Sequence, residues 1–76
     1  MRIDRTIDVK DVNCPMVVMR TKKIIEDLPG GARVEVLATD PMSETDIRQY
    51  CETEGHDLAD TAVVNGIYRF LIVTKE

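Results

Sequence analysis

Hydrophobic and polar positions along the chain follow two different spacings, and each spacing predicts a type of element. Alternation of polar and apolar residues over four to eight positions is typical of a half-buried strand, whereas an apolar stripe with a period of 3.6 residues is typical of an amphipathic helix. Strands are predicted at 6–10, 33–39, 58–64 and 67–74. Helices are predicted at 15–28 and from Ser43 to the residues before Gly55.

The first predicted helix has a single apolar stripe, formed by Val17, Val18, Thr21, Ile24, Ile25 and Leu28. Pro15 fits the first helical position, where a missing N–H costs nothing, and Pro29-Gly30-Gly31 ends the helix. In the next predicted strand, Val34, Val36 and Ala38 face one side of the sheet.

The second predicted helix has recognisable signals at both ends. Ser43-Glu44-Thr45-Asp46 resembles a capping box, with Asp in place of the usual Glu or Gln, and Gly55 is a good left-handed stop. Ile47, Tyr50 and Cys51 share one stripe, so we expect Cys51 to pack in the core. Farther along, Asn65-Gly66 predicts a type I′ turn that joins the last two strands as a hairpin.

The order strand-helix-strand-helix-strand-strand predicts the α/β class, as a two-layer sandwich. Two helices cover one face of a four-stranded sheet better than they cover both, so we expect a mixed sheet with both helices on one face. Leu37, Leu71 and Val73 then fall on the open face. They are either scattered surface residues or part of a partner or dimer surface.

Size and charge narrow the possible functions. A chain of 76 residues predicts one domain, 1–76, and its net charge of −4 with only three aromatic residues opposes nucleic-acid binding. Residues 1–39 carry seven Lys/Arg and six Asp/Glu, whereas residues 40–76 carry three and eight, so any basic surface belongs to the first half.

No apolar run is long enough to span a membrane and the start has no signal-peptide pattern, so we expect a cytoplasmic protein. Two cysteines and one histidine, far apart, make a poor metal site, and no cofactor is implied.

The segment with the clearest chemical signal is Asn13-Cys14-Pro15, at the junction of the first strand and the first helix. Unpaired N–H groups and the helix dipole at a helix start stabilise a thiolate, and they would equally stabilise a persulfide anion. Asn13 and Pro15 are turn residues that argue for an exposed sulfur, although many free cysteines are simply buried. The start of the second helix should lie at the same sheet edge, where Asp40 would oppose this effect unless it is capped or turned away.

His56 follows the second helix, which runs back to the opposite edge of the sheet, so we expect no Cys-His dyad. A sulfur activated by backbone groups without a general base suits group transfer better than hydrolysis.

Four residues of the first helix lie outside its apolar stripe: Met16, Met19, Arg20 and Lys23. They form either a docking surface for an acidic partner or a solvated helix face.

Taken in order, several of these segments resemble the TusA-like (SirA-like) sulfur carrier family. The resemblance rests on Asp11-Val12-Asn13-Cys14-Pro15, the basic helix that follows, Asp40-Pro41, Asp46-Ile47, Cys51, Gly55-His56 and the strand Tyr68-Arg69-Phe70-Leu71-Ile72. Val17 stands where the family's usual Cys-Pro-x-Pro motif has its second proline, and we expect Cys14 to remain positioned without it.

The resemblance implies the same two-layer sandwich and a catalytic Cys14 that accepts sulfane sulfur as a persulfide. It implies a sulfur donor, such as a cysteine desulfurase or a rhodanese, and a downstream acceptor protein in tRNA 2-thiouridine formation, molybdenum cofactor supply or sulfur oxidation. The alternative function is a non-catalytic interaction module that docks through the first helix.

Overall fold

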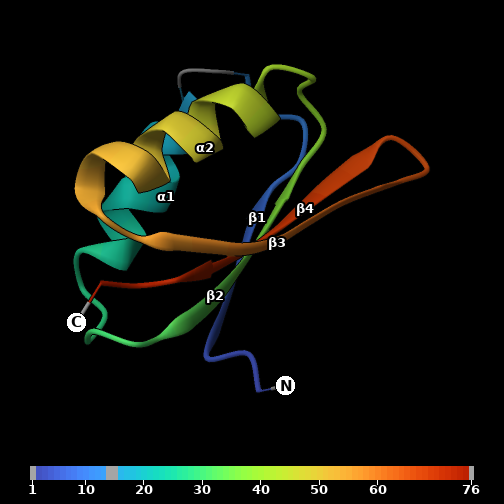
Figure 1. The fold of residues 1–76 in the computed structure, drawn as a ribbon. Coiled ribbons are helices and arrows are strands. Elements are labelled where there is room, and N and C mark those ends of the chain that lie inside the picture. The colour runs from blue at the N-terminus through green and yellow to red at the C-terminus, as the bar shows by residue number, and fades with distance from the viewer. Residues whose placement is uncertain (1, 14–15, 76) are drawn as a thin grey trace.

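The structure, a computed structural model, describes residues 2–13 and 16–75 and consists of a sheet with two helices packed on it (Figure 1). The elements are β1 (Arg5–Val9), α1 (Met16–Ile25), β2 (Arg33–Ala38), α2 (Ser43–Glu54), β3 (Asp57–Val64) and β4 (Ile67–Val73). Both helices lie on one side of the sheet, which confirms the predicted two-layer α/β sandwich.

The sheet is mixed, with strand order β1-β2-β4-β3. β1 and β2 are parallel, whereas β4 runs antiparallel to both β2 and β3. The residues that alternate toward the helices are fully buried and form the core: Ile7, Val9, Val34, Val36, Ala38, Phe70 and Ile72. Because β1 and β2 are parallel, both strands end at the same edge of the sheet, and the site is built at that edge.

α1 buries the predicted stripe but ends earlier than predicted. Val17, Thr21 and Ile25 are buried, whereas Ile24 and Leu28 are partly buried against the core. After Ile25 the hydrogen bonds become those of a 3₁₀ turn, because the N–H groups of Asp27 and Leu28 donate to the carbonyls three residues before them. Neither helix within the described residues is long and apolar enough to cross a membrane.

The capping box predicted at the start of α2 is wrong. The N-cap is Met42, which has no side-chain cap hydrogen bond, and Ser43 is already the first helical residue. Asp40 occupies the capping role from outside the helix, because its Oδ1 accepts the N–H of Met42 at 2.9 Å and its carbonyl accepts the N–H of Ser43 at 3.0 Å. The Ser43 hydroxyl is therefore left fully buried without a hydrogen-bond partner.

The turn and stop signals later in the chain are confirmed. Asn65 and Gly66 both have positive φ, at 51° and 78°, as a type I′ turn requires. Gly55 ends α2 in the left-handed conformation, and its N–H donates to the carbonyl of Cys51. β3 has a register shift between Leu58 and Asp60, which is an irregularity of the β-bulge type in its pairing with β4.

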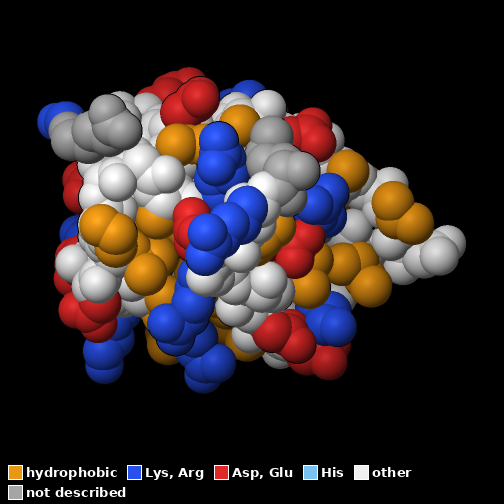
Figure 2. Space-filling view, turned by 90° about the horizontal axis from the view of Figure 1, so that it is seen from below, with side chains coloured by type: hydrophobic (Ala, Val, Ile, Leu, Met, Phe, Trp, Pro, Cys, Tyr) orange, Lys and Arg blue, Asp and Glu red, His pale blue; other side chains and the backbone are white. Residues whose placement is uncertain are grey.

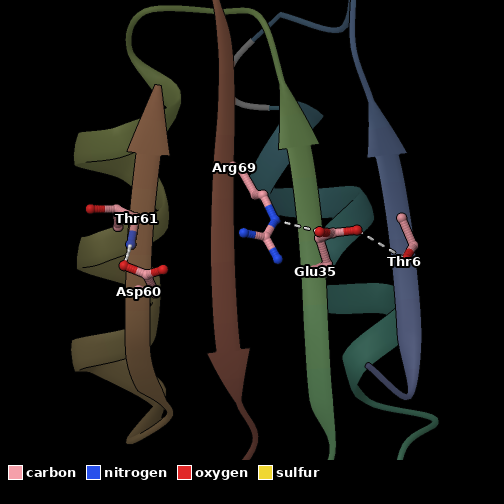
Figure 3. A network of polar contacts seen from close by, with 5 residues as sticks. All are labelled: Thr6, Glu35, Asp60, Thr61 and Arg69. Atoms are coloured by element: carbon pink, nitrogen blue, oxygen red, sulfur yellow. Dashed lines mark hydrogen bonds and ion pairs between the residues drawn. The ribbon is translucent and has the colours of Figure 1, made fainter. Parts of the chain in front are cut away.

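The face of the sheet without helices holds a polar network rather than a continuous apolar surface (Figure 3). Glu35 on β2 accepts hydrogen bonds from Thr6 Oγ1 at 3.2 Å and from the guanidinium of Arg69. Leu71, paired with Glu35 on one side and Asp60 on the other, is 5% exposed, whereas Leu37 and Val73 are half-buried. The three residues predicted for this face lie there, but charged neighbours flank them.

Candidate functional site

Two loops meet at the edge where the parallel strands end. One loop connects β1 to α1 and the other connects β2 to α2. The N–H of Asp11 in the first loop donates to Thr39 Oγ1 in the second, at 2.9 Å, and Asp11 has a positive φ of 64°. The starts of both helices therefore lie at one edge, as predicted from the parallel pairing.

Cys14 and Pro15 lie outside the described residues, and the residues that flank them fix only the position of the connection. Asn13 is exposed, and its carbonyl accepts the N–H of Met16, the first residue of α1, at 2.9 Å. Before it, the N–H of Val12 donates to the carbonyl of Val9 at 3.2 Å, which turns the chain at the end of β1. The roles assigned to Asn13, Cys14 and Pro15 remain predictions.

Asp40 is a carboxylate near the edge where the sulfur is predicted, and an unpaired carboxylate there would oppose an anionic sulfur. In the structure its side chain accepts the N–H of Met42, at the start of α2. Its charge is thus engaged with the positive end of a helix, where a carboxylate is stabilised.

The four candidate docking residues of α1 lie along one exposed stripe. Met16 is 43% exposed and Met19 is 57% exposed, and Arg20 and Lys23 are also exposed. Their spacing of three, four and seven residues places them on the same side of the helix. Within residues 2–13 and 16–75, neither Arg20 nor Lys23 forms an ion pair. Docking itself remains a prediction.

Cys51 is a core residue, as predicted. It is 2% exposed on the inner face of α2. Burial, followed by the negative charge of Asp57, raises the pKa of the Cys51 thiol to about 11, against a small opposing effect of Arg48. Such a thiol is almost wholly protonated near neutral pH and is a poor nucleophile.

His56 lies at the other edge of the sheet. It follows α2, and its Nδ1 accepts the N–H of Lys75, just beyond the end of β4, at 2.9 Å. Because β4 is antiparallel to β2, with Val73 opposite Arg33, this point lies beside the start of β2. His56 also contacts the ring of Tyr50, at 5.5 Å between centroids. The topology therefore separates His56 from the β1–α1 connection.

Sequence reasoning missed two features that form only when the elements pack. The first is a groove of about 400 Å³ between the helices, lined by Val18, Lys22, Asp46, Gln49, Tyr50, Thr53 and Glu54. Burial in its wall raises the pKa of Tyr50 to about 12. The second is the exposure of Met42, Val63 and Val64. Among the described residues, no group of three His, Cys, Asp or Glu side chains could hold a metal ion.

Comparison with known proteins agrees with this arrangement along nearly the whole chain. Residues 5–74 match the family described as Sulfurtransferase TusA. The chain is 39% identical over 72 residues to the sulfur carrier protein TusA of Pseudomonas fluorescens, covering 95% of this chain and 87% of that protein. It is 36% identical over 72 residues to the putative sulfur carrier protein YrkI of Bacillus subtilis, covering 95% and 96% of the two chains.

A solved structure has the same fold. The crystal structure of a SirA-like protein from Desulfitobacterium hafniense superposes with a TM-score of 0.81 at 30% identity, covering 95% of this chain and 99% of that chain. Sequence, fold and the position of the strand-to-helix connection thus agree, and the chain belongs to the TusA family of sulfur carrier proteins.

Proposed function

We propose that the chain acts over residues 1–76 as one sulfur carrier domain, with Cys14 as the residue that accepts sulfane sulfur and holds it as a persulfide. Sulfur comes from a protein donor, such as a cysteine desulfurase or a rhodanese, and goes to an acceptor protein. The downstream route is tRNA thiolation, molybdenum cofactor supply or sulfur oxidation, in the cytoplasm.

The observation that carries the proposal is the position of the segment that contains Cys14. It connects the end of β1 to the start of α1, at the sheet edge where α2 also begins. The first N–H groups of α1 lack partners within the helix, and the helix dipole adds partial positive charge there. Both effects favour an anionic sulfur over a neutral one. Cys51, the other cysteine, is buried with a raised pKa and is unsuited to the role.

The transfer step needs neither a general base nor an external oxidant. The Cys14 thiolate attacks the outer sulfur of the donor's persulfide, the donor's S–S bond breaks, and the donor cysteine leaves as a thiolate. A new S–S bond forms on Cys14, so the number of S–S bonds and of negative charges is unchanged. The absence of a histidine from this edge is consistent with such a relay, because His56 lies at the opposite edge.

The neighbours of Cys14 support this role in two ways. Pro15 and Asn13 position the turn into α1, and the exposed stripe of Met16, Met19, Arg20 and Lys23 guides an acidic partner to the sulfur. The cations of this stripe are available because they form no ion pair within the described residues.

Mass spectrometry of the loaded protein tests the proposal. After incubation with polysulfide, the wild-type chain and the matched control Cys51→Ser should gain about 32 Da per sulfur atom, whereas Cys14→Ser should gain none. Equal gain in Cys14→Ser would refute the assignment. If Cys14→Ser leaves partner binding and cellular role intact while charge reversal at Arg20 and Lys23 removes both, the chain is instead a non-catalytic interaction module.

A further inference from the structure

The exposed large hydrophobic side chains of the described residues are not scattered over the surface. There are five of them, and they are Met16, Met19, Met42, Val63 and Val64. Met16 and Met19 belong to the first turn of α1, Met42 is the N-cap of α2, and Val63 and Val64 end β3. These three elements are far apart in sequence, so their spatial relation follows from the sheet topology.

The topology brings all five residues to one edge. β3 and β2 are both antiparallel to β4, so both run in the same direction and end at the same edge as β1. Ala38, the last residue of β2, is opposite Tyr68, so the turn of the β3–β4 hairpin extends two residues beyond β2. Along this edge the strand order places the connection to α1 first, Met42 next and the hairpin tip last. Val63 is opposite Tyr68, which is itself opposite the core residue Ala38, so Val63 is on the helix side of the sheet and Val64 is on the other side. We refer to Met16, Met19, Met42, Val63 and Val64 as the apolar rim.

The hairpin part of the apolar rim lacks the protection that the rest of its strand has. The first half of β3 carries Asp57 and Asp60 and the register shift, which are devices that discourage association at a sheet edge. The stretch 61–68 has no charged residue, although 32% of the chain is charged. Val63 is 55% exposed and Val64 is 63% exposed. The hairpin extends away from the helices (Figure 1), and hydrophobic side chains are visible at that protruding end of the molecule (Figure 2).

From this arrangement we propose that the apolar rim is a docking surface for the protein that donates sulfur, with the hairpin tip and Met42 extending the contact beyond α1. The inference rests on the proposed function, because a partner that exchanges sulfur at this edge must bring its own sulfur atom to it. The partner surface is apolar opposite the rim and acidic opposite Arg20, which is exposed and forms no ion pair in the described part of the chain.

Binding measured with one donor tests the surface, with a cysteine desulfurase from the same organism as the probe. Val63→Glu and Met42→Glu place a charge on the helix side of the apolar rim at positions exposed enough to leave folding intact, which thermal unfolding checks. Ala59→Glu is the matched control, because Ala59 is an exposed residue of the same strand near the opposite edge. We expect each rim variant to raise the Kd about tenfold or more, and Ala59→Glu to change it less than twofold.

A second readout separates this inference from the proposed function. Loading of Cys14 by polysulfide requires no protein partner, so Val63→Glu and Met42→Glu should gain sulfur as the wild type does. Rim variants that bind the desulfurase as tightly as wild type would overturn the docking surface, and so would a wild-type chain that does not bind it. A wild-type chain that fails to load from polysulfide would overturn the proposed function, while the binding data would still test the rim.

Discussion

At the scale of single residues, we expect the two cysteines to differ in reactivity, because Cys51 is buried and Cys14 is predicted to be exposed. Cys51 is 2% exposed, and its thiol has a pKa of about 11, so at pH 8 only about one molecule in a thousand carries a thiolate there. The sequence predicted this residue as core from its helical stripe alone. For Cys14, the sequence predicted a position between the first strand and the first helix and a role in accepting sulfur. The structure adds the positions of the flanking residues Asn13 and Met16.

Alkylation tests this difference directly. With iodoacetamide at pH 8 we expect Cys14 to react at least about 100-fold faster than Cys51 in the folded protein, because only a thiolate is a good nucleophile. The rate at Cys51 should rise as the pH approaches its pKa of about 11. Tandem mass spectrometry locates the label, and labelling of both cysteines in urea serves as the control. Comparable rates in the folded state would contradict the assignment.

At the scale of elements, local signals predicted the hairpin turn but assigned the cap of α2 to the wrong residue. Asn65-Gly66 specified its turn because positive φ at two positions is a local requirement. The start of α2 was misread, because the Asp40 side chain caps the helix from outside and leaves Ser43 inside it. Asp40 and Ser43 are both residue types that cap helices, and in the structure Asp40 takes that role.

The hairpin turn offers a test of that local requirement. Gly66 has φ of 78°, and a Cβ added there would have nothing within 4 Å, so Gly66→Ala introduces backbone strain without a steric clash. We expect it to lower the free energy of unfolding by about 1 kcal/mol, as measured by urea denaturation with an unchanged m-value. Asn65→Gly, which keeps a residue tolerant of positive φ, should change it by less than about 0.5 kcal/mol. Equal effects of the two substitutions would argue against a type I′ turn.

At the scale of the whole molecule, the topology determines which residues become neighbours. The sequence predicted two layers and a shared edge for the two helix starts, because parallel strands end together. It did not predict that Met42 and the hairpin tip join that edge, since this depends on the strand order β1-β2-β4-β3. The charge is uneven along the chain, because residues 1–39 carry seven Lys/Arg and six Asp/Glu whereas residues 40–76 carry three and eight. Figure 2 shows Lys and Arg side chains in a line on the face seen from below, which is away from the edge where the helices begin.

This uneven charge predicts a salt dependence for binding the sulfur-transfer partner. Exposed cations that are not paired within the described residues, such as Arg20 and Lys23, attract an acidic surface through a field that salt screens. We expect the Kd for a cysteine desulfurase to rise about tenfold between roughly 50 and 500 mM NaCl. Arg20→Glu combined with Lys23→Glu should weaken binding and abolish that dependence. Arg48→Glu, a charge reversal at an exposed position of α2, should leave most of it in place. Binding that is indifferent to salt would mean that the apolar rim acts alone and that the basic stripe of α1 is a solvated helix face.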